Sequence, residues 1–126
     1  MSGTNIVFDT CAIVNLLDRQ YDLSTLGFNV DEAKLLTSFI VRMELLSKRN
    51  ITQDEEQDIQ EFLKDLIIVP IDEVIEQKAI EIRRAASVKL PDCIIAATTI
   101  VLNAVLLTND SDLLGLVWPG FTARNI

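Results

Sequence analysis

Short apolar runs alternate with stretches of helical periodicity along this chain, and the alternation limits the folds that it can adopt. The apolar runs predict short buried strands at residues 5–8, 35–37, 67–69 and 105–107, and residues 117–118 are a candidate for a fifth. The stretches between them predict helices around residues 13–17, at residues 39–48, 54–66 and 73–88, and from Pro91 onward. Strands that alternate with helices are typical of a parallel, doubly wound sheet. The sequence therefore predicts an α/β fold.

The helix that begins at Pro91 is predicted to lie at the centre of the molecule. Proline suits the first turn of a helix, because the amide hydrogen that it lacks would have no partner there. This helix is apolar on almost every side, through Ile94, Ile95, Ala96, Ala97, Ile100 and Val101. A helix that is apolar all round is normally buried.

The length and composition indicate one compact domain, residues 1–126. The chain has 126 residues, of which 49% are hydrophobic and 24% charged, enough to bury a sizeable core. No apolar run approaches the roughly 18 residues of a membrane span. No basic residue precedes the first apolar run, and Asp9 lies close to that run. We therefore expect no membrane segment, no secretory signal and a cytoplasmic protein.

The absence of histidine limits the chemistry of the chain. Ser-His-Asp triads, Cys-His pairs and the usual zinc quartets are excluded, so hydrolysis would depend on carboxylates, a metal ion, Lys, Tyr or Cys. Cys11 and Cys93 stand at predicted helix starts, where we expect small apolar residues of the core instead of redox or zinc sites. The 19 acidic and 11 basic residues give a net charge of −8, which disfavours a large nonspecific nucleic-acid surface.

Two aspartates follow predicted strands at the edge where parallel sheets bind ligands. Asp9 follows the strand at residues 5–8, and Asp110 follows the strand at residues 105–107. Ligands of open parallel sheets bind outside the carboxyl ends of the strands, so both aspartates are candidates for one site. Taken singly, each aspartate is better explained as a helix N-cap or a turn residue. Asp92 has a similar alternative explanation, because an acid in the first turn of a helix is stabilised by the helix dipole.

Glu44 is harder to explain as a purely structural residue. On a helical wheel of residues 39–48 it lies among apolar neighbours, and Arg42 projects well away from it. A carboxylate buried among aliphatic groups is costly unless it finds a cation, so a metal shared with other acids is the favoured partner. Four carboxylates from separate segments, without histidine, suggest a site for Mg²⁺ or Mn²⁺, and such ions act on phosphates.

Four segments of the chain resemble the motifs of PIN-domain ribonucleases, and within that superfamily those of VapC-type toxins of toxin–antitoxin pairs. The segments are Ile6-Val7-Phe8-Asp9-Thr10, Arg42-Met43-Glu44-Leu45, Lys89-Leu90-Pro91-Asp92-Cys93-Ile94-Ile95-Ala96-Ala97-Thr98 and Leu107-Thr108-Asn109-Asp110-Ser111-Asp112-Leu113. The third segment is the most specific, and the resemblance covers essentially the whole chain. It implies a PIN-like three-layer α/β/α fold with a central, mostly parallel sheet of four to five strands, the first and fourth lying side by side.

The resemblance also implies a set of site residues. The family's metal-binding acids correspond to Asp9, Glu44, Asp92 and Asp110, with Asp112 as a second acid of the last motif that could exchange roles with Asp110. Thr108, and Thr10 beside Asp9, are the supporting hydroxyls. Cys11, Cys93 and Leu113 depart from the residues common in the family, but none of them removes a ligand.

The implied activity is metal-assisted hydrolysis of RNA phosphodiester bonds, in which one or two Mg²⁺ or Mn²⁺ ions orient the phosphate and lower the pKa of an attacking water. The implied partners are a second copy of the chain and a small antitoxin, whose C-terminal segment often places an arginine in the acidic pocket. Arg42 and Lys89 lie near the motifs and are candidates for RNA contact, whereas the acids between residues 54 and 65 are expected to form a solvated face.

Two other functions remain open at this point. A phosphotransfer domain of the receiver or haloacid-dehalogenase kind also places aspartates at strand ends, but the second kind needs an acid where Cys11 stands. A noncatalytic PIN-like interaction module would have lost its site acids, whereas here every acid is present.

Overall fold

The structure, a computed structural model, describes residues 4–19 and 30–126. Within these residues five strands form one sheet, in the order β3-β2-β1-β4-β5. The strands are β1 (Asn5–Phe8), β2 (Lys34–Ser38), β3 (Ile67–Val69), β4 (Val105–Thr108) and β5 (Ala123–Asn125). Every pairing is parallel, and β1 pairs with both β2 and β4. The strand order therefore reverses between β1 and β4, at the centre of the sheet.

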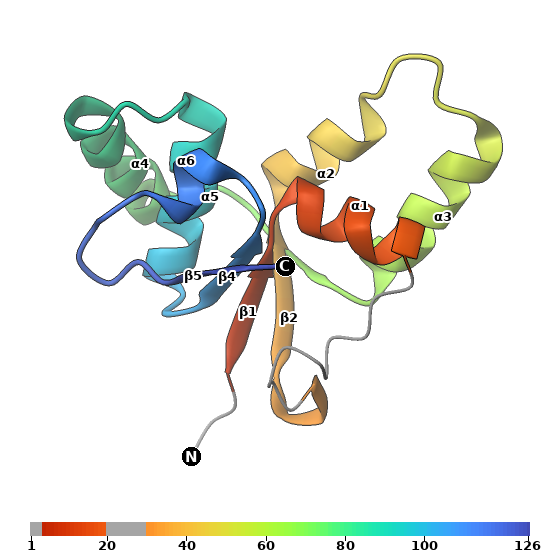
Figure 1. Ribbon diagram of the computed structural model, residues 1–126, viewed down its shortest axis with the longest axis horizontal. Coiled ribbons are helices and arrows are strands. Elements are labelled where there is room, and N and C mark those ends of the chain that lie inside the picture. The colour runs from red at the N-terminus through yellow and green to blue at the C-terminus, as the bar shows by residue number, and fades with distance from the viewer. Residues whose placement is uncertain (1–3, 20–29) are drawn as a thin grey trace.

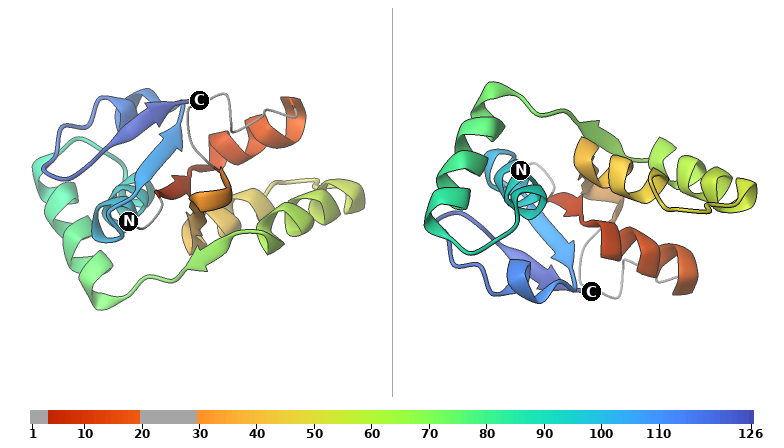
Figure 2. Two further views of the ribbon diagram at one scale, coloured as in Figure 1. Left: turned by 90° about the horizontal axis from the view of Figure 1, so that it is seen from below. Right: turned by 90° about the horizontal axis from the view of Figure 1, so that it is seen from above.

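Helices cover both faces of this sheet. They are α1 (Thr10–Arg19), the 3₁₀ helix η2 (Val30–Glu32), α2 (Phe39–Leu46), α3 (Gln53–Lys64), α4 (Glu73–Ala85), α5 (Leu90–Val101) and α6 (Ser111–Leu114). Figures 1 and 2 show α4 and α5 on one side of the sheet, with α1, α2 and α3 on the other. The predicted α/β fold with three layers and a central parallel sheet is confirmed.

Local signals in the sequence explain where these helices begin. Thr52 and Glu55 form a capping box at the start of α3, each side chain bonding the other residue's backbone amide. Asp72 caps α4 by accepting a hydrogen bond from the amide of Ile75 at 2.8 Å. Pro91 occupies the first turn of α5, as the sequence predicts. Helices α2, α3 and α4 each end two or three residues earlier than predicted. Hydrophobic periodicity locates the middle of a helix better than its ends.

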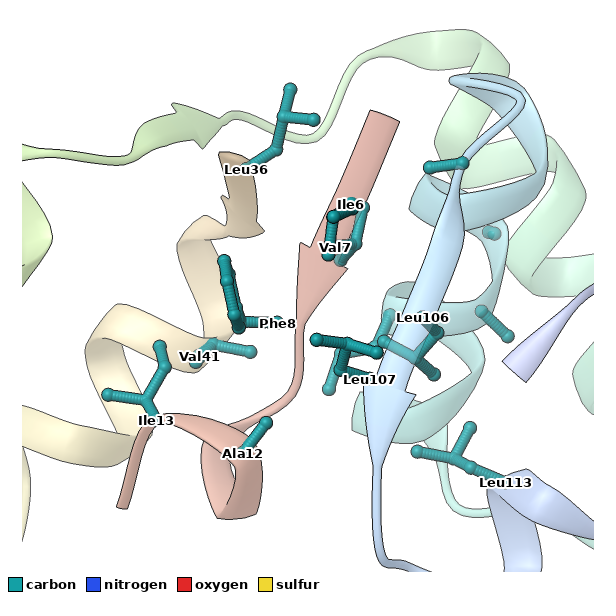
Figure 3. Packing of buried hydrophobic residues seen from close by; sticks show 14 of the residues in the cluster. Ile6, Val7, Phe8, Ala12, Ile13, Leu36, Val41, Leu106, Leu107 and Leu113 are labelled. Carbon is teal, nitrogen blue, oxygen red and sulfur yellow. The ribbon is translucent and has the colours of Figure 1, made fainter. Parts of the chain in front are cut away.

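The core lies on both sides of β1. Ile6, Val7 and Phe8 are fully buried, and Figure 3 shows them between Val41 of α2 and Leu106 of β4. The interior of α5 is fully buried too, through Ile95, Ala96 and Ala97, so the predicted central position of this helix is confirmed. Burial of each large apolar side chain contributes about 1.5–3 kcal/mol, which fixes β1 and α5 relative to each other.

The predicted strand at residues 117–118 is wrong. These residues lie in the loop after α6, and Val117 is 93% exposed. Pro119 follows directly, and proline cannot donate a hydrogen bond to a neighbouring strand. The fifth strand is instead β5, whose pairing is continued by the amide of Ile126 donating to the Thr108 carbonyl at 3.2 Å. Its polar sequence carries no apolar signal, so periodicity could not identify it.

In the part of the chain that the structure describes, no helix is both long enough and apolar enough to cross a membrane. Residues 1–3, on which the expected lack of a secretory signal partly rests, lie outside the described residues.

Candidate functional site

Four of the predicted site acids come together at the carboxyl end of the sheet. Asp9 follows β1, Glu44 lies on α2, Asp92 lies in the first turn of α5, and Asp110 follows β4. All four line one cavity of about 370 Å³. Because β1 and β4 are neighbouring parallel strands, the residues that follow them meet at the same edge, at the point where the strand order reverses. We call this the acidic cavity; its other lining residues are Thr10, Cys11, Val14, Asn15 and Asn109.

Asp9 is held from several directions. Its side chain is buried, with 6% of the residue exposed. One carboxylate oxygen accepts the amide hydrogen of Thr10 at 2.8 Å, and the other accepts the hydroxyl hydrogen of Thr108 at 2.7 Å. The Thr108 oxygen in turn accepts the amide hydrogen of Asp110 at 3.0 Å. Thr108, itself fully buried, therefore connects the segments that carry two of the acids.

Glu44 is exposed, so the prediction that its carboxylate is buried among aliphatic groups is wrong. Val41 and Leu45 are indeed buried, but Met43 is 53% exposed. A helical wheel gives the direction of a side chain and not its depth, and α2 lies at the open end of the sheet. The Glu44 carboxylate accepts a hydrogen bond from the Thr10 hydroxyl at 3.1 Å. Thr10 thus contacts the second acid of the cavity, while its amide binds the first.

The acids influence one another electrostatically. The pKa of Asp92 is raised from 3.8 to about 6, first by partial burial and then by the negative charges of Asp110, Asp9, Glu44 and Asp112, in that order. Like charges favour the protonated form of a neighbouring carboxyl group. The acids are therefore close enough for their negative charges to repel one another, so ionisation of Asp92 in the presence of the others costs free energy.

Asp110 and Asp112 occupy different positions, although the sequence left their roles interchangeable. Asp110 lines the acidic cavity and is also the N-cap of α6, accepting the amide hydrogens of Asp112 and Leu113 at 2.9 and 3.1 Å. Asp112 lines a separate cavity beside Ala86 and Ser87. The N-cap explanation of Asp110 and its candidate site role are therefore both compatible with its position.

The oxygen atoms that line the acidic cavity are the ligands that a hard cation prefers. The cavity offers carboxylate and amide oxygens, which Mg²⁺ and Mn²⁺ favour, and a divalent ion would offset the repulsion that raises the pKa of Asp92. Within residues 4–19 and 30–126, no three acidic or cysteine side chains are arranged to hold a metal ion as they stand. The residues of the acidic cavity fit such an ion by the chemistry of their oxygen atoms.

The two cysteines differ. Cys93 is fully buried and donates to the Val88 carbonyl at 3.4 Å, as expected of a small core residue. Cys11 is half-buried and lines the acidic cavity, so the prediction that it is a core residue is wrong. Its sulfur lies 3.5 Å from the Asp9 carboxylate and accepts the amide hydrogen of Asn109 at 3.3 Å. Burial is the main cause that raises the pKa of the Cys11 thiol.

Sequence reasoning missed Asn15 and Asn109 as lining residues. Asn15 lies one helical turn after Cys11, on the same side of α1, and that spacing could have identified it. Asn109 lies within the last motif, directly before Asp110. Arg42 and Lys89 are exposed and do not line the acidic cavity, so the structure does not bring these two candidates to the acids.

A second cavity, of about 320 Å³, adjoins the first between α1, α2 and α3. The two cavities share Thr10, Val14 and Glu44. Val14, Leu17, Leu45 and Ile59 give the second cavity an apolar surface, and Asp18 and Asp58 add acids. Lys48, which also lines it, forms an ion pair with Glu55. We call this the amphipathic groove.

Solved structures with the same fold are found among toxin–antitoxin complexes. VapBC2 from Rickettsia felis, bound to a promoter DNA fragment, is 21% identical with a TM-score of 0.82, over 98% of this chain and 99% of that chain. DNA-bound VapBC from Salmonella typhimurium is 18% identical with a TM-score of 0.77, over 97% and 98%. A toxin–antitoxin complex from Klebsiella pneumoniae is 24% identical with a TM-score of 0.73, over 94% and 95%. At these identities the likeness concerns the fold.

No curated protein sequence matches the chain. The family model of the PIN domain, in contrast, matches residues 6–116, which span β1 to the end of α6 and contain all four acids of the acidic cavity. The chain therefore belongs to the PIN-domain family.

Proposed function

We propose that this chain is a metal-dependent endoribonuclease and the toxin of a toxin–antitoxin pair. PIN domains are nucleases, a class of hydrolase. The observation that carries the proposal is the acidic cavity, in which Asp9, Glu44, Asp92 and Asp110 from four separate segments face one space. A cavity lined by carboxylates repels the phosphates of RNA unless a cation is bound, so the arrangement is best explained by a site for a divalent ion.

In this proposal the four acids of the acidic cavity hold Mg²⁺ or Mn²⁺. When bound, such an ion polarises the phosphate and lowers the pKa of an attacking water. Thr108 and the amide of Thr10 hold the Asp9 carboxylate in one orientation, and the Thr10 hydroxyl holds Glu44. Asp112 is assigned no direct contact with the ion, because it lines a different cavity.

RNA is the proposed substrate, with Arg42 and Lys89 as contacts for its phosphates. Both side chains are exposed, and Lys89 lies immediately before α5, which carries Asp92. With few cations near the acids, nonspecific affinity should be low, and we infer a short, structured RNA target.

The proposed partners are an antitoxin and a second copy of the chain, in the cytoplasm, where RNA targets are found. Similar folds occur in VapBC complexes, which supports an antitoxin. The amphipathic groove opens toward Glu44, and its apolar surface and acids suit an amphipathic segment that carries arginine.

The test is cleavage of total cellular RNA by the purified protein with Mg²⁺ or Mn²⁺, with EDTA as the chelator control. We expect discrete fragments, lost with EDTA and in the Asp9→Asn and Glu44→Gln variants. Glu61→Gln is the matched control, because Glu61 is an exposed acid on α3 outside both cavities. Cleavage that survives EDTA or the Asp9→Asn change would contradict the proposal.

Calorimetric titration with Mn²⁺ separates the other functions. A noncatalytic interaction module would neither bind the ion at the acidic cavity nor cut RNA. A phosphotransfer domain would bind the ion but would form a phospho-intermediate when given a phosphodonor.

A further inference from the structure

A third cavity, of about 340 Å³, lies between the α4–α5 turn and α6. The turn contributes Ala86, Ser87 and Val88, and α6 with the loop after it contributes Ser111, Asp112, Gly115, Leu116 and Val117. Figure 1 shows α6 beside α5 and the end of α4. We call this the turn cavity. None of the four acids of the acidic cavity lines it.

The lining combines an apolar surface with hydrogen-bonding groups. Val117 is 93% exposed, although a branched apolar side chain is normally packed, and Leu116 beside it is half-buried. The hydroxyls of Ser87 and Ser111 can donate or accept, and the Asp112 carboxylate accepts. An apolar surface with a few polar groups at its edge suits a flat, partly apolar ring that packs against the aliphatic side chains and carries N–H donors along its rim, as an unpaired nucleobase does.

The turn cavity is connected to the acidic cavity through one short segment. Asp110 lines the acidic cavity and Asp112 the turn cavity, and the amide of Asp112 donates to the Asp110 carboxylate at 2.9 Å. The charge of Asp112 also contributes to the raised pKa of Asp92. A ligand in the turn cavity would therefore lie next to the acids.

The distribution of charge favours the same side of the molecule. Arg83 and Arg84 lie in the last turn of α4, and Lys89 lies immediately before α5, so three cations stand within a few residues of the α4–α5 turn along the chain. The opposite side carries the acids of α3, which are Asp54, Glu55, Glu56, Asp58 and Glu61. A phosphate backbone is attracted to the first side and repelled by the second.

We propose that the turn cavity binds an unpaired base of the RNA substrate next to the scissile phosphate, and that it prefers guanine. Guanine presents two adjacent N–H donors, which a carboxylate such as that of Asp112 can accept together. The identity of the RNA as substrate rests on the proposed nuclease function, whereas binding of the base does not.

Fluorescence of Trp118 tests the binding of the base. Trp118 is the single tryptophan of the chain and directly follows Val117. We expect guanosine 5′-monophosphate to quench it saturably and uridine 5′-monophosphate, which has the same phosphate, to quench it less. Ser87→Leu, which fills the cavity, and Val117→Glu, which alters an exposed rim residue without affecting the core, should weaken guanosine binding about fivefold or more. Ser47→Leu, an exposed serine at the end of α2, is the matched control and should leave quenching unchanged.

A series of oligonucleotides, varied at each position around a mapped cleavage site, tests the role in specificity. We expect the wild type to prefer guanine at one position next to the cleaved bond. The variants Ser87→Leu and Val117→Glu should lose this preference. Their affinity for Mn²⁺, measured by calorimetry, should equal that of the wild type. Equal quenching by both nucleotides, or equal quenching in all variants, would overturn the turn-cavity proposal even if RNA is cleaved. Selective quenching by the guanosine nucleotide without RNA cleavage under any metal condition would instead refute the proposed nuclease function.

Discussion

At the scale of single residues, the Thr108 hydroxyl links the two strands that supply acids to the acidic cavity. It donates to Asp9 and accepts from the amide of Asp110, and all three groups lie near the end of β4. A buried hydroxyl that satisfies two polar partners stabilises the fold and orients the carboxylate at the same time.

The change Thr108→Val should lower the free energy of unfolding by about 1–3 kcal/mol, because it leaves a buried carboxylate oxygen and an amide without this partner. Urea unfolding would measure the loss, and Thr108→Ser should restore most of it. Thr98→Val is the matched control, since within residues 4–19 and 30–126 the Thr98 hydroxyl bonds only to the Ile94 carbonyl of its own helix. An equal loss in both valine variants would show that the link to Asp9 adds nothing.

Asp92 should make stability depend on pH in the absence of divalent ions. Its pKa is raised from 3.8 to about 6 in the folded protein, so the folded state holds a proton that the unfolded state has already released. The stabilisation is complete below about pH 4 and is lost as the pH rises through about 6. The measurement compares the free energies of unfolding of the wild type and of Asp92→Asn at several pH values in EDTA. We expect the difference, wild type minus variant, to fall between about pH 4 and pH 6 and then to level off. A difference that rises with pH would contradict the assigned cause.

At the scale of elements, most of the secondary structure follows from local patterns. The strand at residues 67–69 is predicted with the bounds that the structure shows, because a short apolar run ends at Pro70. The capping residues of α3 and α4 likewise act within a few residues of the helix start. In contrast, β5 depends on backbone pairing with β4, a contact that no periodicity within residues 123–125 could reveal.

The capping box of α3 gives a prediction at this scale. Thr52→Ala should lower the free energy of unfolding by about 0.5–2 kcal/mol, because the amide of Glu55 loses its partner at 3.1 Å. Chemical denaturation of the variant would measure this effect. Thr52→Ser should be close to the wild type, and a loss as large as that of the alanine variant would show that the methyl group, not the hydroxyl, matters.

At the scale of the whole molecule, part of the negative charge gathers at the acidic cavity, where a cation would offset it. The net charge is −8, and four carboxylates share the acidic cavity. A ligand that binds the folded state stabilises it in proportion to the logarithm of its concentration over its Kd, about 2.7 kcal/mol at a hundredfold excess over Kd.

Mn²⁺ and Mg²⁺ should therefore raise the Tm of the protein, and EDTA should reverse the shift. We expect Asp110→Asn to reduce the shift more than Asp112→Asn, because Asp110 faces the acidic cavity and Asp112 does not. Asparagine is also a good N-cap, so the first change should preserve α6. Differential scanning calorimetry would measure the shift, and a larger effect of Asp112→Asn would reverse the assignment of these two acids.

The sequence by itself determined the α/β class and the central helix α5, because both depend on short-range periodicity, and it placed Asp9 and Asp110 at one edge of the sheet, because each follows a strand. Glu44 and Asp92 lie on helices, and their assignment to the same site comes from the resemblance to PIN-domain motifs. The tertiary structure alone decided that Glu44 is exposed, that Cys11 lines the acidic cavity and that Asp112 faces the turn cavity. The physical reason is that the depth and surroundings of a side chain are set by elements distant in the sequence. The Thr10 hydroxyl that contacts Glu44 comes from another helix, and the Ser87 that lines the cavity of Asp112 comes from another turn.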